Sequence, residues 1–523
     1  MPNMLIRCHR ALFAFRGRIS HGASAAVRRR SASGEGKRGL ATVYLGLGSN
    51  VGDRHVNLLR AYKGLRELGE VDAASFLYET PPMYVEDQPR FLNAACRLST
   101  ELDPAALLGR LKNIETAVGR VDSTRWGPRA VDVDILMYDD LVLDGKSLDK
   151  KNGSDGNSAR QKNRWLQIPH PRMHERPFVL RPLVDIEPGL VHPLLGSTAE
   201  ELLVKVLSDE DRRSGVGGLR VLPMGVTEGE TRLWPMEGQP SRTYVMGILN
   251  ATPDSFSDGG QHHGMAAVVE HALSMVRDGA DIVDVGGEST RPGAAEISVD
   301  EEVSRVVPVI EAIRAATASE GNGGVTVSVD TRRAAVAAAA IAAGAHAVND
   351  VSGGRFDPEI LSVVAEAGVP LVMMHMRGTP QTMTSLTDYG DNLVGVVTES
   401  LEACSRTAEA AGVPRWMHVL DPGIGFAKTH SQSLVLLRRL DAIAARVGSP
   451  LLVGPSRKRF VGELTGETEA SCRDWGTVGA CCSAAERGAK FVRVHNVRGV
   501  SQALVVADAI RGASTTSVDT VCR

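Results

Sequence analysis

The chain has 523 residues and a formal net charge of −3, and 43% of its residues are hydrophobic and 23% are charged. This composition is typical of a globular protein, and the length is too great for one ordinary core, so we expect two domains. The small net charge gives no indication of nucleic-acid binding, and no hydrophobic run reaches the roughly 18 residues that a membrane helix needs. The seven cysteines lack the spacing of a zinc site, which favours a reducing compartment over a disulfide framework.

Residues 1–40 differ from the rest of the chain because they are rich in arginine and contain a single acidic residue, Glu35. An arginine-rich, serine-containing and acid-poor segment is typical of an organellar transit peptide. The alternative is a disordered basic tail that binds anionic surfaces. The density of arginine favours the mitochondrial matrix, with the plastid and the cytosol as alternatives. We leave this leader out of the fold prediction.

Residues 41–207 predict a small α+β domain. Strand and helix patterns follow one another in the order β-α-β-β-α-β, which is the order of a ferredoxin-like split unit. Asp103 and Pro104 fit the N-cap and the first turn of the second helix. Residues 144–163 are polar, which indicates a flexible surface insertion. The polar stretch 208–240 is interpreted as a linker to the second half of the chain.

Residues 241–514 contain eight short hydrophobic runs, each closed by a polar cluster and most of them followed by a helical pattern. Eight such units predict a (β/α)8 TIM barrel, and the nearly continuous hydrophobic runs fit strands that are buried on both faces. The alternative is an open, doubly wound parallel sheet. Residues 515–523 are interpreted as a tail.

In a TIM barrel the active site lies at the carboxyl ends of the strands. The polar residues at those ends are Asn250, Glu288, Thr290, Arg291, Asp330, Asn349, Asp350, His375, Asp421, Ser456, Lys458, Arg493 and His495. Any one of them could be a turn or capping residue. Together they offer carboxylates and amides to a polar planar ring, and cationic or donor groups to an anion such as phosphate. We therefore predict a site for a planar ring and an anion at this end of the barrel.

In the first domain, the stretch 125–140, RWGPRAVDVDILMYDD, contains an alternating strand with two aspartates. A period of two places Asp132 and Asp134 on the same face of that strand. Two unpaired carboxylates are costly to remove from water, whereas Mg²⁺ prefers carboxylate and phosphate oxygens. We predict that the pair holds Mg²⁺ against phosphate, with Arg120 and Arg129 stabilising the charge that moves during transfer. The alternative is an exposed aspartate pair on an edge strand.

Two sets of motifs resemble known families. From about Tyr244 to Gly512 the chain contains, in order, GILNATPDSFSDGG, DVGGESTRPGA, SVDT, VNDVSGG, DPGIGFAK, GPSRKRF and RVHNV, and these resemble the motifs of dihydropteroate synthase. Residues 43–195 contain LGLGSNVGDR, ETPPMYVEDQPRFLNAA, RWGPRAVDVDILMYDD and IPHPRMHERPFVLRPL, which resemble 6-hydroxymethyl-7,8-dihydropterin pyrophosphokinase. The fusion of the two is similar to the bifunctional mitochondrial enzymes of the plant folate pathway.

The resemblance to the pyrophosphokinase implies roles for residues of the first domain. The nucleotide contacts would be His170, Arg172 and Arg176, and two Mg²⁺ ions would bind through Asp132 and Asp134. The pterin would lie near Thr80, Pro81, Pro82, Phe91, Asn93 and Phe178, because aromatic faces and an amide suit a flat heteroaromatic ring. Without the resemblance, a core position is as good an interpretation of Phe91 and Phe178.

The resemblance to the synthase implies roles at the mouth of the barrel. Asn250 would bind the Mg²⁺ of the pyrophosphate, and Arg291, Arg493 and His495 would contact the anion, with Thr290 nearby. The pterin would be held by Asp330, Asn349, Asp421 and Lys458, and p-aminobenzoate by Phe426, Ser456 and Pro292. Arg493 and His495, together with Mg²⁺, would stabilise the leaving pyrophosphate, and Lys458 is counted with them as catalytic.

The function implied is a pair of consecutive reactions. The first domain would transfer diphosphate from ATP to 6-hydroxymethyl-7,8-dihydropterin, and the second would join the product to p-aminobenzoate, giving 7,8-dihydropteroate and pyrophosphate. Two alternatives stay open: a pterin-binding barrel of the methyltransferase type, and a pterin- or nucleotide-binding module in which one domain is inactive. Mg²⁺ is the expected cofactor, ATP is a co-substrate, and the expected partners are small molecules without nucleic acid or membrane. We also expect a homodimer or higher homo-oligomer formed through the barrel.

Overall fold

The computed structural model describes residues 39–83, 87–120, 127–145, 166–207, 218–227, 229–238, 242–251, 261–289, 295–317 and 324–513. The predicted leader 1–40 and the predicted insertion 144–163 lie almost wholly outside these residues, and the tail 515–523 lies wholly outside them. Both predicted domains belong to one compact unit, Leu40–Arg523. In the described part of the chain, no helix combines the length and the hydrophobicity needed to cross a bilayer.

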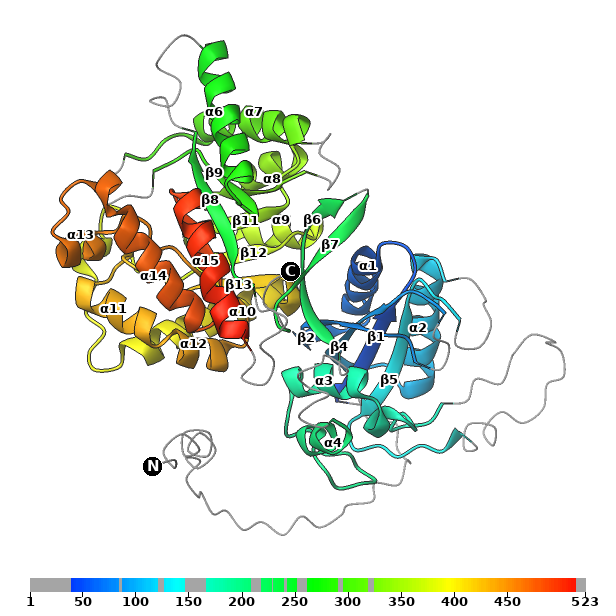
Figure 1. Ribbon diagram of the computed structural model, residues 1–523. Coiled ribbons are helices and arrows are strands. Elements are labelled where there is room, and N and C mark those ends of the chain that lie inside the picture. The colour runs from blue at the N-terminus through cyan, green and yellow to red at the C-terminus, as the bar shows by residue number, and fades with distance from the viewer. Residues whose placement is uncertain are drawn as a thin grey trace. The chain divides into compact units, whose positions relative to one another are not determined.

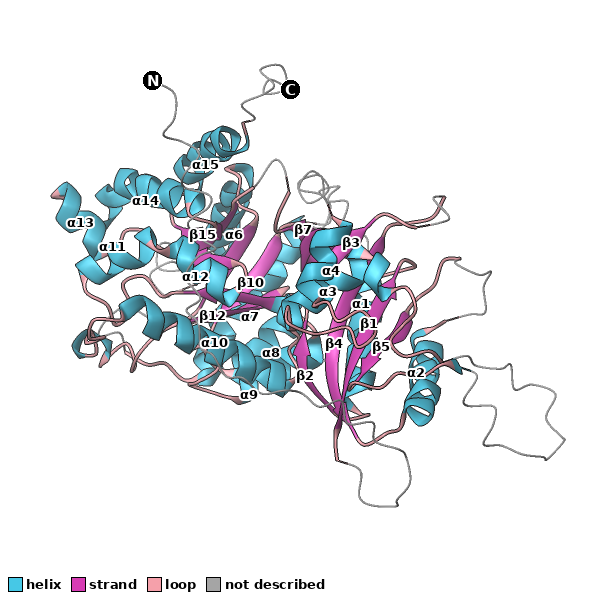
Figure 2. Ribbon diagram, turned by 90° about the horizontal axis from the view of Figure 1, so that it is seen from below, coloured by secondary structure: helices cyan, strands magenta, loops and turns pink. Residues whose placement is uncertain are grey.

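The first domain is built on an antiparallel sheet with helices packed on it (Figures 1 and 2). Its strands are β1 (Ala41–Ser49), β2 (Glu70–Ala74), β3 (Leu77–Thr80), β4 (Phe91–Thr100) and β5 (Asp132–Tyr138), and its helices are α1 (Arg54–Arg66), α2 (Pro104–Val118), α3 (Pro177–Ile186) and α4 (Ala199–Val206), with the short 3₁₀ helix η2 (Met173–Glu175). The sheet order is β5-β1-β4-β3, and β2 pairs with β4. This arrangement confirms the predicted α+β class, and β2 adds one strand to the predicted order.

Aspartate residues cap the amino ends of α1 and α2. The Asp103 carboxylate accepts hydrogen bonds from the backbone N–H groups of Ala105 and Ala106, and Pro104 occupies the first turn of α2, as predicted. Asp53 caps α1 in the same way through the N–H of Val56, at 3.0 Å. From these starting points α1 packs on β1 and β4, and α2 packs on β5 and on α1.

The second domain is a closed barrel of eight parallel strands, and this confirms the TIM-barrel prediction over the open sheet. The strands are β8 (Tyr244–Asn250), β9 (Ile282–Gly286), β10 (Thr326–Asp330), β11 (Ala347–Asp350), β12 (Leu371–Met374), β13 (His418–Asp421), β14 (Leu451–Val453) and β15 (Ala489–Val494). The helices around them are α6 (Gln261–Arg277), α7 (Val299–Thr317), α8 (Ala334–Ala342), α9 (Glu359–Ala367), α10 (Leu393–Ala411), α11 (His430–Arg438), α12 (Leu440–Val447), α13 (Arg459–Thr465), α14 (Asp474–Glu486) and α15 (Val497–Gly512), with 3₁₀ turns η4 (Met383–Ser385), η5 (Arg415–Met417) and η6 (Ala470–Arg473).

The stretch that we interpreted as a linker contains a β-hairpin in its described part. Strands β6 (Leu219–Thr227) and β7 (Glu230–Pro235) pair with each other, and β6 also pairs with β3, so the hairpin extends the sheet of the first domain. Figure 1 shows the hairpin between the two domains. The many polar and glycine residues of this stretch favoured a linker in the sequence analysis, although its hydrophobic residues alternate as they do in strands.

The hairpin also closes the bottom of the barrel. Leu222, Met224, Trp234 and Met236 form one buried cluster with barrel residues at the amino ends of the strands, including Tyr244, Ile282, Ala347 and Phe491. The Trp234 ring stacks on Tyr244 at a centroid distance of 4.5 Å. The opposite, carboxyl end of the barrel is therefore the end left for chemistry.

Candidate active sites

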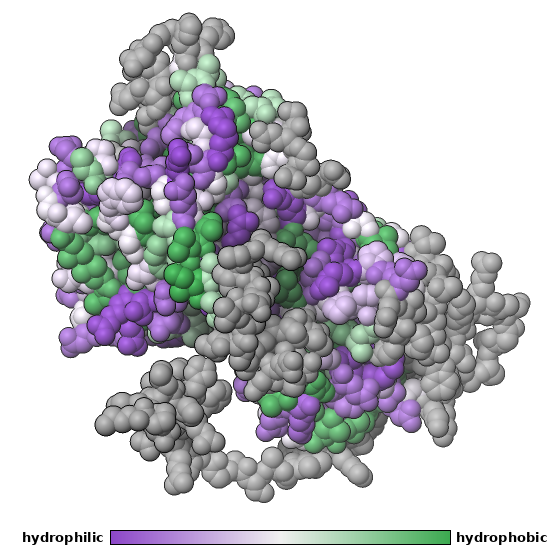
Figure 3. Space-filling view, viewed as in Figure 1, coloured by the Kyte–Doolittle hydropathy of each residue, from purple (hydrophilic) through white to green (hydrophobic). Residues whose placement is uncertain are grey.

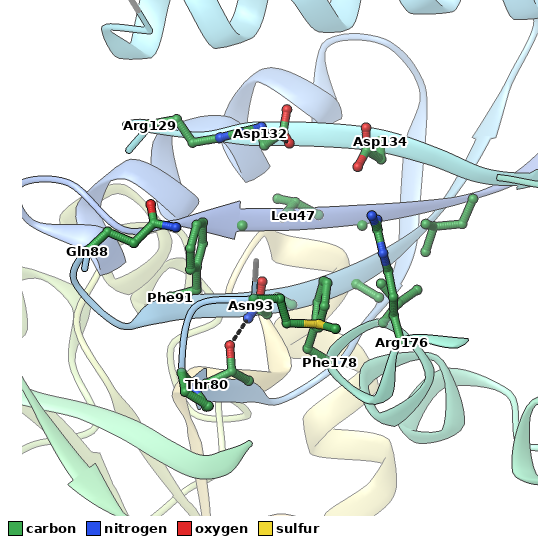
Figure 4. A pocket seen from close by; sticks show the side chains of 18 residues that line it. Leu47, Thr80, Gln88, Phe91, Asn93, Arg129, Asp132, Asp134, Arg176 and Phe178 are labelled. Atoms are coloured by element: carbon green, nitrogen blue, oxygen red, sulfur yellow. Dashed lines mark hydrogen bonds and ion pairs between the residues drawn. The ribbon is translucent and has the colours of Figure 1, made fainter. Parts of the chain in front are cut away.

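The first site is a pocket of about 130 Å³ beside the sheet of the first domain. Its lining comes from β1, β3, β4, β5 and the start of α3 (Figure 4). The predicted residues that line it are Thr80, Pro81, Phe91, Asn93, Arg129, Asp132, Asp134, Arg176 and Phe178. Residues far apart in the sequence are thus brought together as predicted.

Asp132 is held between two arginines. Arg120 Nη1 lies 2.6 Å from its Oδ1, and Arg129 Nη1 lies 2.7 Å from its Oδ2. Burial alone would raise the pKa of Asp132, but the charges of Arg129 and Arg120 offset burial, and the pKa is lowered. Glu115, which is 1% exposed, also pairs with Arg120 and thereby fixes the position of this arginine.

Asp134 points from the same face of β5 into the same pocket (Figure 4). Burial, and then the neighbouring charge of Asp132, raise the pKa of Asp134 to about 6. Within the described parts of the chain its carboxylate accepts no hydrogen bond, although Lys112 and Arg176 attract it electrostatically. The two carboxylates share a face, as the alternation predicted, but only Asp132 is neutralised by direct ion pairs.

The opposite side of the pocket suits a flat ring. Asn93 donates a hydrogen bond to Thr80 Oγ1 at 2.7 Å, which fixes the orientation of the amide. Phe91 and Phe178 contribute aromatic surface to the lining, and both rings are partly exposed, so neither is a fully buried core residue. A Cβ at Gly48 would lie 3.0 Å from Asn93 Oδ1, so the backbone of β1 passes close to this amide.

The predicted residues His170, Arg172, Pro82 and Arg120 are outside the pocket lining, although Arg120 reaches it through Asp132. Burial lowers the pKa of His170 to about 4, with Arg176 and Arg172 adding to the shift, so its ring is neutral near pH 7. Met83 and Gln88 are among the lining residues that were not predicted. Both belong to the motif ETPPMYVEDQPRFLNAA, which resembles the pyrophosphokinase, so that motif was the available signal.

The second site is centred on a carboxylate that the sequence did not single out. Asp284 in β9 has no exposed surface, and its oxygens accept hydrogen bonds from Ser328 Oγ at 2.6 Å, Asn349 Nδ2 at 2.9 Å and Arg493 Nε at 2.6 Å. Arg493 Nη2 also lies 2.6 Å from Asp330 Oδ2. One signal was available, because an aspartate inside the buried run IVDVG is rare unless it is paired.

Asp330 and Asp421 are buried at this end of the barrel, and Lys458 is half-buried beside them. Burial raises the pKa of Asp330 to about 7 despite the charge of Arg493. Burial also raises the pKa of Asp421, and it lowers the pKa of Lys458 to about 8. The Lys458 ammonium donates to the carbonyl of Ile424 and lies 4.3 Å from the centre of the Phe426 ring.

Further predicted residues meet at the neighbouring strand ends. Ser456 Oγ lies 2.9 Å from His495 Nδ1 and accepts the His495 N–H at 3.1 Å. Asn250 is exposed at the carboxyl end of β8, next to Gly286 of β9. The predicted residues Thr290, Arg291 and Pro292 lie outside the described residues.

Three of the predicted strand-end residues serve the structure instead. Asp350 accepts the N–H groups of Ser352 at 2.7 Å and Gly354 at 2.5 Å, so it is a turn residue. Glu288 pairs with two buried arginines, Arg332 and Arg333, at 3.4 Å each. His375 contacts Lys428 at 2.9 Å.

Comparison with known proteins separates the chain into the same two parts. The family model of 7,8-dihydro-6-hydroxymethylpterin-pyrophosphokinase matches residues 44–188, and the model of pterin binding enzymes matches residues 246–495. The mitochondrial folate synthesis bifunctional protein of Pisum sativum is 40% identical over 90% of this chain and 89% of its own length. The folic acid synthesis protein of Pneumocystis carinii is also 40% identical, and the chain spans 60% of that longer protein. The wild-type HPPK-DHPS of Plasmodium falciparum, solved with pterin and p-hydroxybenzoate, shares the fold at 23% identity, with a TM-score of 0.71 over 92% of this chain and 99% of that one.

The fold, the two sites and these matches define a two-domain transferase that acts on pterins. The chain belongs to the family of bifunctional folate synthesis proteins, with a 6-hydroxymethyl-7,8-dihydropterin diphosphokinase domain and a dihydropteroate synthase barrel. The first activity makes the pterin diphosphate with ATP, and the second condenses it with p-aminobenzoate. Because the relatives that match both halves of the chain are folate synthesis proteins, the methyltransferase-type alternative is not supported.

Proposed function

We propose that the pocket of the first domain binds Mg²⁺·ATP at its acidic side, through Asp132 and Asp134. Two properties of Asp134 support this assignment. It faces the pocket and accepts no hydrogen bond from the described residues. Its pKa is raised by burial and by repulsion from Asp132, and a divalent ion would offset both. Among the described residues no group of three or more His, Cys, Asp or Glu side chains is arranged to hold a metal. A two-carboxylate site suits Mg²⁺ that is completed by water and substrate phosphates.

The arginines of this pocket act on the moving diphosphate. Arg129 and Arg120 orient Asp132 and stabilise the negative charge that develops on the leaving AMP as its bond to the diphosphate breaks. Arg176 lines the pocket next to Asp134, and we assign it with His170 and Arg172 to the nucleotide. The dihydropterin lies between Phe91 and Phe178 with Asn93 and Thr80 at its polar edge, and Pro81 and Pro82 beside it.

In the barrel, the pterin diphosphate binds at the strand ends around Asp284. Asp330, Asn349, Asp421 and Lys458 hold the ring, and Phe426 and Ser456, with Pro292, face the p-aminobenzoate. Asp330 can offer either a proton or a lone pair to the ring, because its pKa is close to 7. Arg493 and His495, with Thr290 and Arg291, neutralise the departing pyrophosphate, and Mg²⁺ held near Asn250 would supply further charge stabilisation. The aniline nitrogen then attacks the methylene carbon, with no general base required from the chain.

The observation that carries this assignment is the separation of the two constellations. Asp132 and Asp134 line one pocket on β5, and Asp330, Asn349, Lys458 and Arg493 lie at the carboxyl ends of barrel strands. We expect Asp132→Ala to reduce AMP formation at least about 100-fold while dihydropteroate synthesis from supplied pterin diphosphate is unchanged. Lys458→Ala should give the opposite result. Both half-reactions are measured on the purified full chain.

Equal losses of both activities in both variants, with unchanged thermal unfolding, would contradict the two-site assignment. The same assay decides whether one domain is an inactive binding module. A wild-type chain that binds pterin but lacks one half-reaction would show that the domain concerned has lost its activity.

We infer a location in the mitochondrial matrix. The support is the arginine-rich, acid-poor leader and the mitochondrial name of the Pisum sativum relative. We set the domain boundaries at 41–207 and 241–514, with residues 1–40 as the leader and 515–523 as a tail. A fusion of residues 1–40 to a fluorescent protein should accumulate in mitochondria, and a fusion that stays in the cytosol or enters plastids would overturn the assignment.

We infer a homodimer formed through the barrel. Exposed hydrophobic side chains gather on the face of helices α11, α13, α14 and α15 (Figure 3). They are Leu434, Val435, Leu464, Trp475, Val505, Val506 and Ile510. An exposed hydrophobic face of this kind is typical of an interface, and a second copy would cover it by two-fold symmetry. Sedimentation should give twice the chain mass, and Val505→Glu should give a monomer with the kinase half-reaction intact.

A further inference from the structure

Lys428 is a buried lysine with no assigned role in either half-reaction. It follows β13 by a few residues and is 7% exposed. Its ammonium contacts three acceptors: His375 Nδ1 at 2.9 Å, the carbonyl of Phe426 at 2.9 Å and the carbonyl of His375 at 3.5 Å. No carboxylate of the described residues forms an ion pair with it. Lys428 therefore connects the end of β12 with the loop after β13.

His375 is well suited to accept this hydrogen bond. Burial, and then the charge of Lys428, lower the pKa of His375 to about 2, with Arg355 and Arg377 also opposing protonation. The ring is therefore neutral, and Nδ1 offers a lone pair while Nε2 carries the proton. Among the groups that face Lys428, Asp421 attracts its charge, whereas Lys458, Arg377 and Arg355 repel it.

The loop that Lys428 holds has a strained backbone. Ala427 has a φ of 50°, in the left-handed region that residues with a side chain rarely adopt. The Tyr389 hydroxyl donates to the Ala427 carbonyl at 3.1 Å, and Lys428 holds the adjacent carbonyl of Phe426. Gly423, in the same loop, has a φ of +70°, and a Cβ there would lie 2.0 Å from the His375 carbonyl oxygen. Close packing against β12 thus fixes the path of the loop.

The other side of this loop belongs to the active site. Lys458 donates to the Ile424 carbonyl and lies over the Phe426 ring at 4.3 Å. Its neighbour Arg457 is also strained, with a φ of 57°, and is anchored by Asp474 at 2.7 Å and by the hydroxyl of Thr477 at 3.0 Å. The buried Lys428 and the half-buried Lys458 therefore hold one loop from two sides, and each lies next to a left-handed residue.

We propose that Lys428 is a positioning residue of the synthase: with Tyr389 it holds residues 423–427 in the strained path that presents Phe426 to p-aminobenzoate and keeps the loop in contact with Lys458. This inference rests on the proposed roles of Phe426 and Lys458. Lys428 itself touches no reacting atom, because its three hydrogen bonds are directed to the protein. Its removal should therefore weaken p-aminobenzoate binding more than it slows turnover.

The test measures both half-reactions in the full chain. Lys428→Met keeps the length of the side chain and removes its donors, and it should raise KM for p-aminobenzoate at least tenfold with a smaller fall in kcat. Tyr389→Phe, which loses a single hydrogen bond, should raise KM in the same direction by a few-fold. Lys428→Arg should recover part of the affinity. The kinase half-reaction reports that each variant is folded, and Arg439→Met, at an exposed position after α11, controls for the loss of one positive charge.

An unchanged KM in a folded Lys428→Met protein would overturn the proposal. A variant with a lower melting temperature and a lower kcat but an unchanged KM would also overturn it, because that is the result expected of a purely structural residue. If Lys428→Met does not fold, Tyr389→Phe decides by the same criterion. Phe426→Ala separates this inference from the proposed function: if it leaves KM unchanged, the role of Phe426 is wrong, and if it raises KM while Lys428→Met does not, only the positioning role is wrong.

Discussion

Asp132 and Lys458 show how one half-buried residue in each site keeps its charge. Asp132 stays ionised because Arg120 and Arg129 each contact one of its oxygens. Lys458 has only the more distant Asp421 to favour its charged form, and burial therefore lowers its pKa to about 8. The two residues should therefore differ in pH dependence. The arginines that pair with Asp132 keep their charge at high pH, whereas the desolvated ammonium of Lys458 loses its proton.

Lys458 should limit the synthase at high pH. Its pKa is below the ordinary lysine value, so the free enzyme loses this charge as the pH rises through about 8. We expect kcat/KM for the pterin diphosphate to fall about tenfold per pH unit above that value, as measured in pH-rate profiles. Bound diphosphate favours the charged lysine, so kcat should decline at higher pH than kcat/KM.

Lys458→Arg provides the control for this titration. An arginine remains charged across the range, so the alkaline decline should disappear, whatever the absolute rate. A decline at the same pH in the arginine variant would assign it to another group.

At the scale of elements, the β6–β7 hairpin has the greatest effect on the architecture. It joins the sheet of the kinase through β3 and covers the bottom of the barrel through Trp234. Asp53 of the kinase also binds the hairpin. Its Oδ2 accepts hydrogen bonds from the backbone N–H and the hydroxyl of Thr231, at 2.8 Å each. One short element is thus part of both domains.

Trp234→Ala should destabilise the barrel by about 3–5 kcal/mol, because it removes a buried ring that stacks on Tyr244. Trp234→Phe keeps an aromatic face and should cost much less. Denaturant unfolding, followed separately by the loss of each half-reaction, measures the effect. If Trp234→Ala unfolds no earlier than wild type, the hairpin is not needed to close the barrel.

The repeated pattern of the barrel and the strand with Asp132 and Asp134 could be predicted because periodicity and motif order lie within short windows. Asp284 and the hairpin were not predicted, since their importance arises from contacts across large sequence separations. Asp284 gains its partners from three other strands, and the hairpin residue Trp234 is buried by strands that follow it in the chain. His375 and Asp350 were predicted at the site because a strand end alone does not distinguish a turn residue from a ligand.

At the scale of the whole molecule, the kinase and the barrel are joined by polar contacts that are only partly buried. Arg66 donates to the carbonyls of Glu409 and Ala410 at 3.0 and 2.9 Å. Arg220 donates to the Gly448 carbonyl at 2.7 Å, and the Phe76 ring lies between Arg220 and Arg415. Most of these contacts end on backbone carbonyls, so they depend on the folded state of both partners.

Glu409 should make the stability of this contact dependent on pH. Burial raises its pKa from 4.5 to about 7, so the stability that the neutral form provides is present at low pH and is lost as the pH rises through about 7. Glu409→Gln is neutral throughout and should melt above wild type by a margin that grows between about pH 5 and pH 8. Glu366→Gln, an exposed change on α9, should show no such trend, and a constant margin for Glu409→Gln would contradict the assignment.

The sealed floor of the barrel has a consequence for the passage of the intermediate. Since the hairpin attaches the kinase sheet at the floor, the synthase site at the carboxyl ends of the strands opens on the far side of the barrel. We therefore expect the pterin diphosphate made by the kinase to mix with the pterin diphosphate in solution before the synthase binds it. The test starts a coupled reaction from labelled hydroxymethyldihydropterin and adds unlabelled pterin diphosphate. The label in dihydropteroate should fall in proportion to the unlabelled pterin diphosphate added. Label that does not fall would show direct transfer of the intermediate between the two sites.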